Sequence, residues 1–265
     1  MSGALSLLAP LSDVSLAAVE VSSAAAGDPV VHGLSMFTVA IILHIVLFVY
    51  WLGGDLGVYY SSRFIIKPEL SPETRAIAAK IMVGCDMAPR FSLILFGASG
   101  VTLMYYGPLG EESFLTGWMV ALAWVATLVW AYLSLQEART GGQPSHGFFH
   151  RADLVIRHVA ALVLVAMGLY AVVVSDPFGV ETNPKWLGAK VVFYGLSIFC
   201  GIMIRRALKP FGPSFGRLMT EGSSPEVEDG IVGSIRRSEP WVYAIWFFVL
   251  AAAVLGVIKP GYVGL

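Results

Sequence analysis

Six apolar stretches constrain this chain more than any other feature. Each is close in length to the roughly 20 residues that a helix needs to cross the hydrocarbon core of a bilayer. They run approximately over residues 35–60, 81–106, 114–136, 154–175, 186–204 and 241–258. Backbone polar groups find no water partner in lipid, and these stretches are continuously apolar rather than alternating in polarity. The sequence therefore predicts six transmembrane helices and not a barrel.

The composition points the same way. Of the 265 residues, 57% are hydrophobic and only 13% are charged, whereas an ordinary globular domain carries about 25% charged residues. Disorder needs the opposite balance. The formal net charge of −1 gives no general attraction to nucleic acid. We therefore expect an all-α, polytopic membrane helix bundle whose surroundings are the lipid bilayer.

Lys and Arg residues are divided unevenly between alternate connections, which predicts the orientation of the bundle. One side carries only Lys185 and Lys259. The other side carries Arg63, Lys67, Arg75, Lys80, Arg139, Arg151, Arg205, Arg206, Lys209, Arg217, Arg236 and Arg237. The basic side is expected in the cytoplasm and both termini outside, as in a multi-pass protein of the bacterial inner (cytoplasmic) membrane.

The chain is expected to have two parts. Residues 1–34 carry no Lys or Arg and are expected to form an outer N-terminal extension, while residues 35–265 carry the six-helix domain. Within this domain, residues from about 205 to 240 are rich in Pro, Gly, Ser and charge. They are expected to form a cytoplasmic loop.

Ionisable side chains inside the apolar stretches are the most informative residues, because each costs about 2.5–3.5 kcal/mol to insert at the centre of a membrane helix. Those in the first, second, fourth and fifth stretches are His44, Asp55, Asp86, Arg90, Arg157, His158 and Lys190. The interiors of the third and sixth stretches have none. This asymmetry predicts a polar site enclosed by four of the six helices.

Helical spacing refines this prediction. His44, Trp51 and Asp55 lie on one stripe of the first helix, and Asp86 and Arg90 are four residues apart, so they can pair along the second helix. From the helical rise, His44 and Arg90 are expected near the bilayer midplane. Asp55, Asp86, Arg157 and His158 are expected in the inner part of the bilayer, and Lys190 in the outer half.

Each of these residues also has a structural interpretation. His44 could simply form a hydrogen bond across helices, and Asp86 with Arg90 could be a structural ion pair. Asp55 could cap a local break in its helix, within Gly53-Gly54-Asp55. Arg157 and His158 could belong to the cytoplasmic interface, and Lys190 could extend to the outer headgroups.

Several short motifs resemble a group of bacterial membrane proteins that contains the HemJ-type protoporphyrinogen oxidases and the CopD-like copper-resistance proteins. The motifs are the run from His44 through Trp51 and Gly54 to Arg63, then Lys80-Ile81-Met82, Gly100-Val101-Thr102-Leu103, and Pro184-Lys185-Trp186-Leu187-Gly188-Ala189-Lys190-Val191. The resemblance implies that His44 ligates haem b and that Lys190 is functional. Where HemJ-type proteins carry a further histidine, this chain has Cys200 and Met203, so a second axial ligand stays open.

The leading hypothesis is an integral membrane haem b protein with a redox role, an oxidoreductase or electron-transfer protein. His44 is the expected metal ligand, since neutral imidazole is a common haem ligand. Arg90, Arg157 and Lys190 could neutralise carboxylates of the cofactor or of a porphyrin substrate, and Asp55 or Asp86 could relay protons. Asp86, Arg90 and Lys190 are the candidate catalytic residues. If the resemblance holds, the reaction is oxidation of protoporphyrinogen IX or of another quinone-linked substrate.

Two other functions remain open. A CopD-like copper permease would use soft thioether ligands, and Met36, Met104, Met119 and Met167 lie in the outer halves of their helices, although no methionine ladder is present. The chain could also be a structural subunit that associates with itself or with partners in a larger membrane electron-transfer complex.

Overall fold

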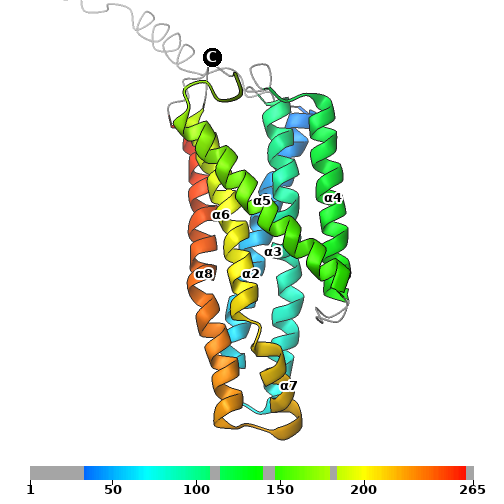
Figure 1. The fold of residues 1–265 in the computed structure, drawn as a ribbon, viewed down its shortest axis with the longest axis vertical. Helices are drawn as coiled ribbons and strands as arrows, with labels where there is room; N and C mark the ends of the chain where they lie inside the picture. The colour runs from blue at the N-terminus through cyan, green and yellow to red at the C-terminus, as the bar shows by residue number, and fades with distance from the viewer. Residues whose placement is uncertain (1–32, 108–113, 140–146, 180–183, 261–265) are drawn as a thin grey trace, which may run out of the picture. The chain divides into compact units, whose positions relative to one another are not determined.

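Helices account for the regular structure of the chain wherever it is described. A computed structural model describes residues 33–107, 114–139, 147–179 and 184–260. The helices are α2 (Met36–Ile65), α3 (Pro72–Tyr106), α4 (Gly117–Arg139), α5 (Gly147–Val173), α6 (Lys185–Ala207), α7 (Phe211–Glu221) and α8 (Pro225–Ile258), with a short 3-10 turn at Pro177–Gly179. No strand occurs in these ranges. The all-α prediction is therefore confirmed (Figure 1).

The six predicted spans are also confirmed. Six helical stretches are long and apolar enough to cross a membrane, the fifth of them combining α6 and α7. The described helices belong to one compact unit. The predicted outer extension, residues 1–34, lies outside the described residues except at its last two positions.

The helices differ in length. α4 and α6 have 23 residues each, about 35 Å at 1.5 Å per residue. α3 has 35 residues and α8 has 34. Each is therefore about 50 Å long. As a result α2, α3 and α8 continue well past the ends of α4 and α5 at the bottom of Figure 1, where α7 lies beside them. We call this the extended end, and the end that contains Met36, Tyr106 and Ile258 the opposite end.

The expectation of a loop over residues 205–240 is wrong, because α7 and the first half of α8 occupy most of it. Ser224 caps α8 by accepting a hydrogen bond from the Val227 backbone N–H, and Pro225 stands at the first helical position, where proline is tolerated. Apolar side chains at helical spacing in α8 are buried against α2, α3 and α7. The resulting cluster contains Ile65, Ala78, Met82, Leu218, Val227, Ile231 and Ile235.

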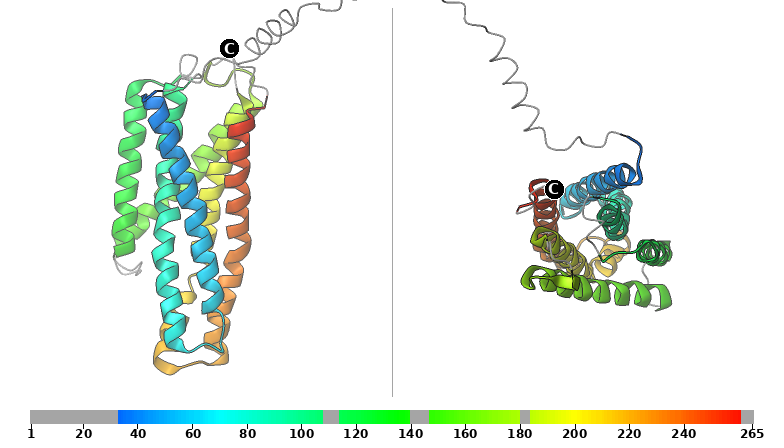
Figure 2. Two further views of the ribbon diagram at one scale, coloured as in Figure 1. Left: turned by 180° about the vertical axis from the view of Figure 1, so that it is seen from behind. Right: turned by 90° about the horizontal axis from the view of Figure 1, so that it is seen from above.

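Most of the helices pack against the helix that precedes or follows them in the chain. α2 lies along α3, α6 lies along both α5 and α8, and α4 packs on α3 and α5. α5 crosses the bundle diagonally (Figures 1 and 2). The central apolar core, with Trp51, Leu93, Trp130, Ile198 and Ile245 among its buried residues, fills the space between them.

Glycines set the closest helix contacts. A Cβ on Gly54 would collide with the Pro89 ring on α3, and a Cβ on Gly168 would lie 2.7 Å from the Gly188 carbonyl oxygen on α6. α2 runs without interruption through Gly53 and Gly54. The interpretation of Asp55 as the cap of a helix break is therefore wrong. Gly54 serves helix packing, whereas a Cβ on Gly53 would meet nothing within 4 Å.

Candidate functional site

His44 lies on α2 with one ring nitrogen already bound. Its Nδ1 is 2.8 Å from the Ser99 hydroxyl of α3, and Ser99 in turn donates to the Phe96 carbonyl oxygen at 2.9 Å. The imidazole lies against the Phe96 ring, with 3.9 Å between ring centroids. Because the Ser99 hydroxyl group donates its proton to the Phe96 carbonyl oxygen, the Ser99 oxygen accepts the hydrogen bond from His44 Nδ1–H. This tautomer leaves Nε2 as a lone-pair donor.

Lys190 of α6 lies close enough to His44 for its charge to act on the imidazole. Its side chain crosses to α8, where it fills the space that a Cβ on Gly256 would take, and its Nζ lies 5.8 Å from the centroid of the Trp186 ring. Among the described residues no carboxylate forms an ion pair with it. Gly256 is two residues from the last residue of α8. The ammonium group therefore lies close to the opposite end of the bundle.

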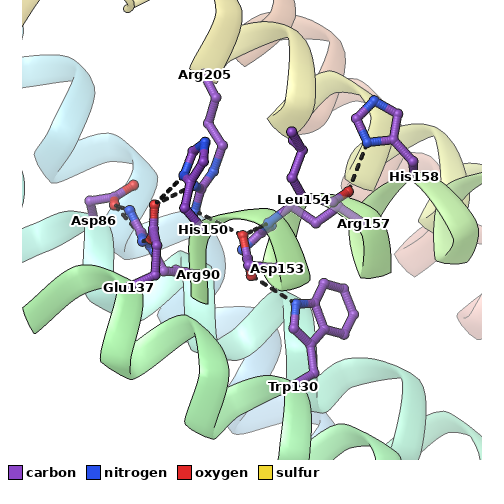
Figure 3. A network of polar contacts seen from close by, with 10 residues as sticks. All are labelled: Asp86, Arg90, Trp130, Glu137, His150, Asp153, Leu154, Arg157, His158 and Arg205. Carbon is purple, nitrogen blue, oxygen red and sulfur yellow. Dashed lines mark hydrogen bonds and ion pairs between the residues drawn. The ribbon is translucent and has the colours of Figure 1, made fainter. Parts of the chain in front are cut away.

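A second polar group, which we call the arginine–carboxylate network, joins α3, α4, α5 and α6 (Figure 3). Its first centre is Glu137 of α4, whose side chain is only 7% exposed. Arg90 Nη1 lies 2.8 Å from one Glu137 oxygen, and Arg205 Nη1 lies 2.9 Å from the other. Arg90 also pairs with Asp86, one turn earlier on α3. The predicted Asp86–Arg90 pair is confirmed.

The second centre of the network is Asp153 of α5, which is 1% exposed. Arg157 Nε donates to it at 2.7 Å, the Trp130 indole N–H donates at 3.0 Å, and Arg205 Nη2 lies 3.5 Å away. Arg205 therefore bridges the two centres. Three arginines meet three carboxylates, so the network is formally neutral, as buried charges require.

The network lies where α4 ends and α5 begins. The last turn of α4 and the first turns of α5 supply Glu137, His150 and Asp153 at the level of Arg90. The predicted second span begins near residue 81, whereas α3 begins at Pro72, after the Ser71 cap. Eighteen residues of α3 precede Arg90 and sixteen follow it.

The predicted site residues therefore separate into two groups. His44 and Lys190 lie near one another toward the opposite end. Asp86, Arg90 and Arg157 belong to the arginine–carboxylate network, where each guanidinium group pairs with a carboxylate of the chain itself, while Arg157 Nη2 is buried without a hydrogen-bond partner. Asp55 lies close enough to Asp86 for their charges to interact. His158 is exposed and its Nδ1 lies 2.7 Å from the Leu154 carbonyl oxygen of its own helix.

Three central residues of the network were missed by sequence reasoning. Glu137 stands one residue beyond the predicted third helix, Asp153 one residue before the predicted fourth, and Arg205 one residue beyond the predicted fifth. Arg205 had been counted only as a loop cation. All three residues lie at the edges of apolar stretches, and their charges are complementary. This pattern could have identified them as partners. His150 is 41% exposed and its Nδ1 lies 3.4 Å from Glu137 Oε1.

Cys200, considered as a replacement axial ligand, is 2% exposed and packs within the central apolar core. Among the described residues no group of three or more His, Cys, Asp or Glu side chains could hold a metal ion. Comparison with protein-family models, with curated proteins and with solved structures finds no match to the chain.

Proposed function

We propose that this protein is a membrane haem b protein with a redox role, in which His44 ligates the iron through Nε2. The observation that carries the proposal is the Nδ1–Ser99 hydrogen bond. Metal-ligating histidines commonly donate their second ring N–H to a protein acceptor, which fixes the tautomer and the orientation of the ring. A single imidazole is sufficient for haem, as in globins and peroxidases.

The surroundings of His44 support the same proposal. Phe96 supplies an aromatic wall, and a Cβ on Gly100 would stand 3.8 Å from His44 Cε1, so a small residue lies beside the ring. Lys190 offers an ammonium group that no carboxylate of the described chain neutralises. A haem propionate, or the carboxylate of a porphyrin substrate, is a suitable partner for it.

When bound, haem would supply one-electron chemistry, and the chain supplies position and charge. His44 would hold the iron, Ser99 would hold His44, and Lys190 would hold a propionate. Arg90 and Arg157 each pair with a carboxylate of the chain, so Lys190 is the propionate partner in this proposal. A quinone-linked oxidation, with protoporphyrinogen IX as one substrate, is the reaction class we propose.

The visible spectrum of the purified full-length chain, produced with ample haem precursor, tests the proposal. We expect a reducible Soret band that His44→Gln removes or shifts, because an amide is a poor substitute for imidazole. Ser99→Ala should keep the band but weaken haem retention by about 10- to 100-fold. His158→Gln is the matched control and should leave the spectrum unchanged. A wild-type protein without a Soret band, or His44→Gln with an unchanged one, would contradict the proposal.

A further inference from the structure

Six polar or aromatic side chains face one another across α2 and α8, none of them a member of the His44 site or of the arginine–carboxylate network. Asp55, Tyr59 and Arg63 follow at four-residue spacing on α2, so they lie on one stripe. Glu239, Tyr243 and Trp246 follow at four and three residues on α8. We call these six residues the α2–α8 row.

The row is connected by close contacts at the extended end. The hydroxyl groups of Tyr59 and Tyr243 are 2.7 Å apart, and either can be the donor. Arg63 donates from Nη2 to the Tyr59 hydroxyl, and its Nη1 lies 2.9 Å from Glu239 Oε1. The Arg63 and Glu239 side chains are 33% and 22% exposed. This end of the row therefore reaches solvent-accessible surface.

The other end of the row stops at a carboxyl group whose hydrogen bonding is incomplete. Asp55 Oδ2 is buried without a hydrogen-bond partner, and so is Trp246 Nε1, although the indole lies beside the carboxyl group. Asp86 of α3 faces Asp55 with a second negative charge. Trp246 packs edge-on to the Tyr59 ring, 5.4 Å between centroids, and to the Tyr243 ring at 5.8 Å. Asp55, Trp246 and the tyrosine pair are thus continuous.

We propose that the α2–α8 row transfers protons between the extended end and the carboxyl group of Asp55. A structural role would explain the tyrosine pair and the Arg63–Glu239 ion pair. It does not explain why the buried Asp55 Oδ2 has no partner within hydrogen-bond distance, since buried polar groups normally find partners. A site that alternately binds and releases a proton is a physical reason for such an oxygen.

After the transfer, every side chain along the path except Asp55 carries the same protons as before. Arg63 keeps its proton throughout and holds the Tyr59 hydroxyl in place. Each tyrosine oxygen accepts a proton as it gives up its own, so one O–H bond forms for each one that breaks. Asp55 and Tyr59 are four residues apart on α2, about 6 Å along the helix axis, and one water molecule between their side chains would complete the path. The net change is one proton removed from water at the extended end and one O–H bond formed on Asp55.

Infrared spectroscopy of the full chain in lipid vesicles tests this inference without haem or substrate. We expect the C=O band of a protonated carboxyl group, lost in Asp55→Asn and kept in the control Asp229→Asn, which alters an exposed carboxyl group. Transfer to D₂O should shift the band. In the double variant Tyr59→Phe/Tyr243→Phe the shift should slow by about tenfold, as expected from losing one hydrogen-bonded step.

Tyr60→Phe is the control for the double variant, since Tyr60 is 67% exposed and lies outside the row. Exchange at the wild-type rate in the double variant would overturn the inference, as would a wild-type protein without the Asp55 band. The infrared readout needs no cofactor, so a failure here is distinct from a missing Soret band. If Asp55→Asn does not fold, the exchange rates of the two tyrosine variants still decide the matter.

Discussion

Arg90 of α3 and Glu137 of α4 form an ion pair with 2.8 Å between Nη1 and Oε2. Arg205 of α6 reaches the other oxygen of the same carboxylate at 2.9 Å. One nearly buried carboxylate therefore connects three helices. Asp86, the other partner of Arg90, has a side chain that is 43% exposed. The two carboxylates around Arg90 are unequal in burial and should be unequal in energy.

We predict that Glu137→Gln lowers the free energy of unfolding by about 3–5 kcal/mol, because it leaves Arg90 and Arg205 without their shared carboxylate. Asp86→Asn should cost less, about 1 kcal/mol, since Arg90 keeps its pair with the more buried Glu137. Reversible unfolding in mixed micelles measures both. In double-mutant cycles Arg90→Leu should couple more strongly to Glu137→Leu than to Asp86→Leu, and equal couplings would contradict this ranking.

The extended end depends on Arg75, which is 1% exposed. Its Nη1 and Nη2 donate to the two oxygens of Glu228 at 2.7 and 2.8 Å, and its Nε donates to the Ile65 carbonyl oxygen at 2.8 Å. Arg75→Lys cannot reproduce this fork. We predict faster amide hydrogen exchange throughout α7 and the first turns of α8.

Arg217→Lys is the matched control for Arg75→Lys, because the Arg217–Glu221 pair is more than half exposed on both sides. Such a pair contributes at most about 1 kcal/mol, so exchange in α7 should stay near the wild-type rate. If both variants exchange alike, the Arg75–Glu228 pair does not hold the extended end together.

The α5–α6 contact has no room for a methyl group at Gly168, where a Cβ would lie 2.7 Å from the Gly188 oxygen and from the Val192 nitrogen. Gly168→Ala should therefore destabilise the protein by about 1–3 kcal/mol through overpacking. Gly201→Ala on α6 meets nothing within 4 Å and should be neutral or stabilising. Thermal unfolding of the two variants side by side checks this, and equal melting temperatures would contradict it.

Labelling tests the predicted orientation. In a background with Cys85 and Cys200 replaced by serine, we expect Leu34→Cys to react with an impermeant thiol reagent in intact cells. Ser223→Cys, between α7 and α8, should react only after the cells are broken. Ser2→Cys should behave like Leu34→Cys, since both termini are expected outside. Labelling of position 223 from outside intact cells would reverse the orientation.

Helix formation could be predicted from the sequence because it depends on local information. A continuous apolar run about 20 residues long has no alternative to helix in lipid, and all six runs form helices. The pairing of Asp86 with Arg90 could be predicted for the same reason, since residues four apart on a helix are neighbours by geometry.

The lengths of the helices could not be predicted in this way. Polar sequence before residue 241 indicated a loop, yet Val227, Ile231 and Ile235 form the start of α8, because Ile65 and Met82 of α2 and α3 give them a surface on which to be buried. Residues 225–240 carry a helix cap and apolar residues at helical spacing, but the surface that buries them comes from a distant part of the chain, which their own sequence does not show.

The sequence by itself determined that this protein is a bundle of membrane helices and that a few charges, Asp86 and Arg90 among them, lie within it. Only the tertiary structure decided their partners. Arg205 and Glu137 are 68 residues apart, and Tyr59 and Tyr243 are 184 apart. The crossing of α5 over α4 and α6 and the meeting of α2 with α8 bring these side chains together. A charge or hydroxyl group inside a membrane needs a partner, but the packing of whole helices determines which one comes within reach.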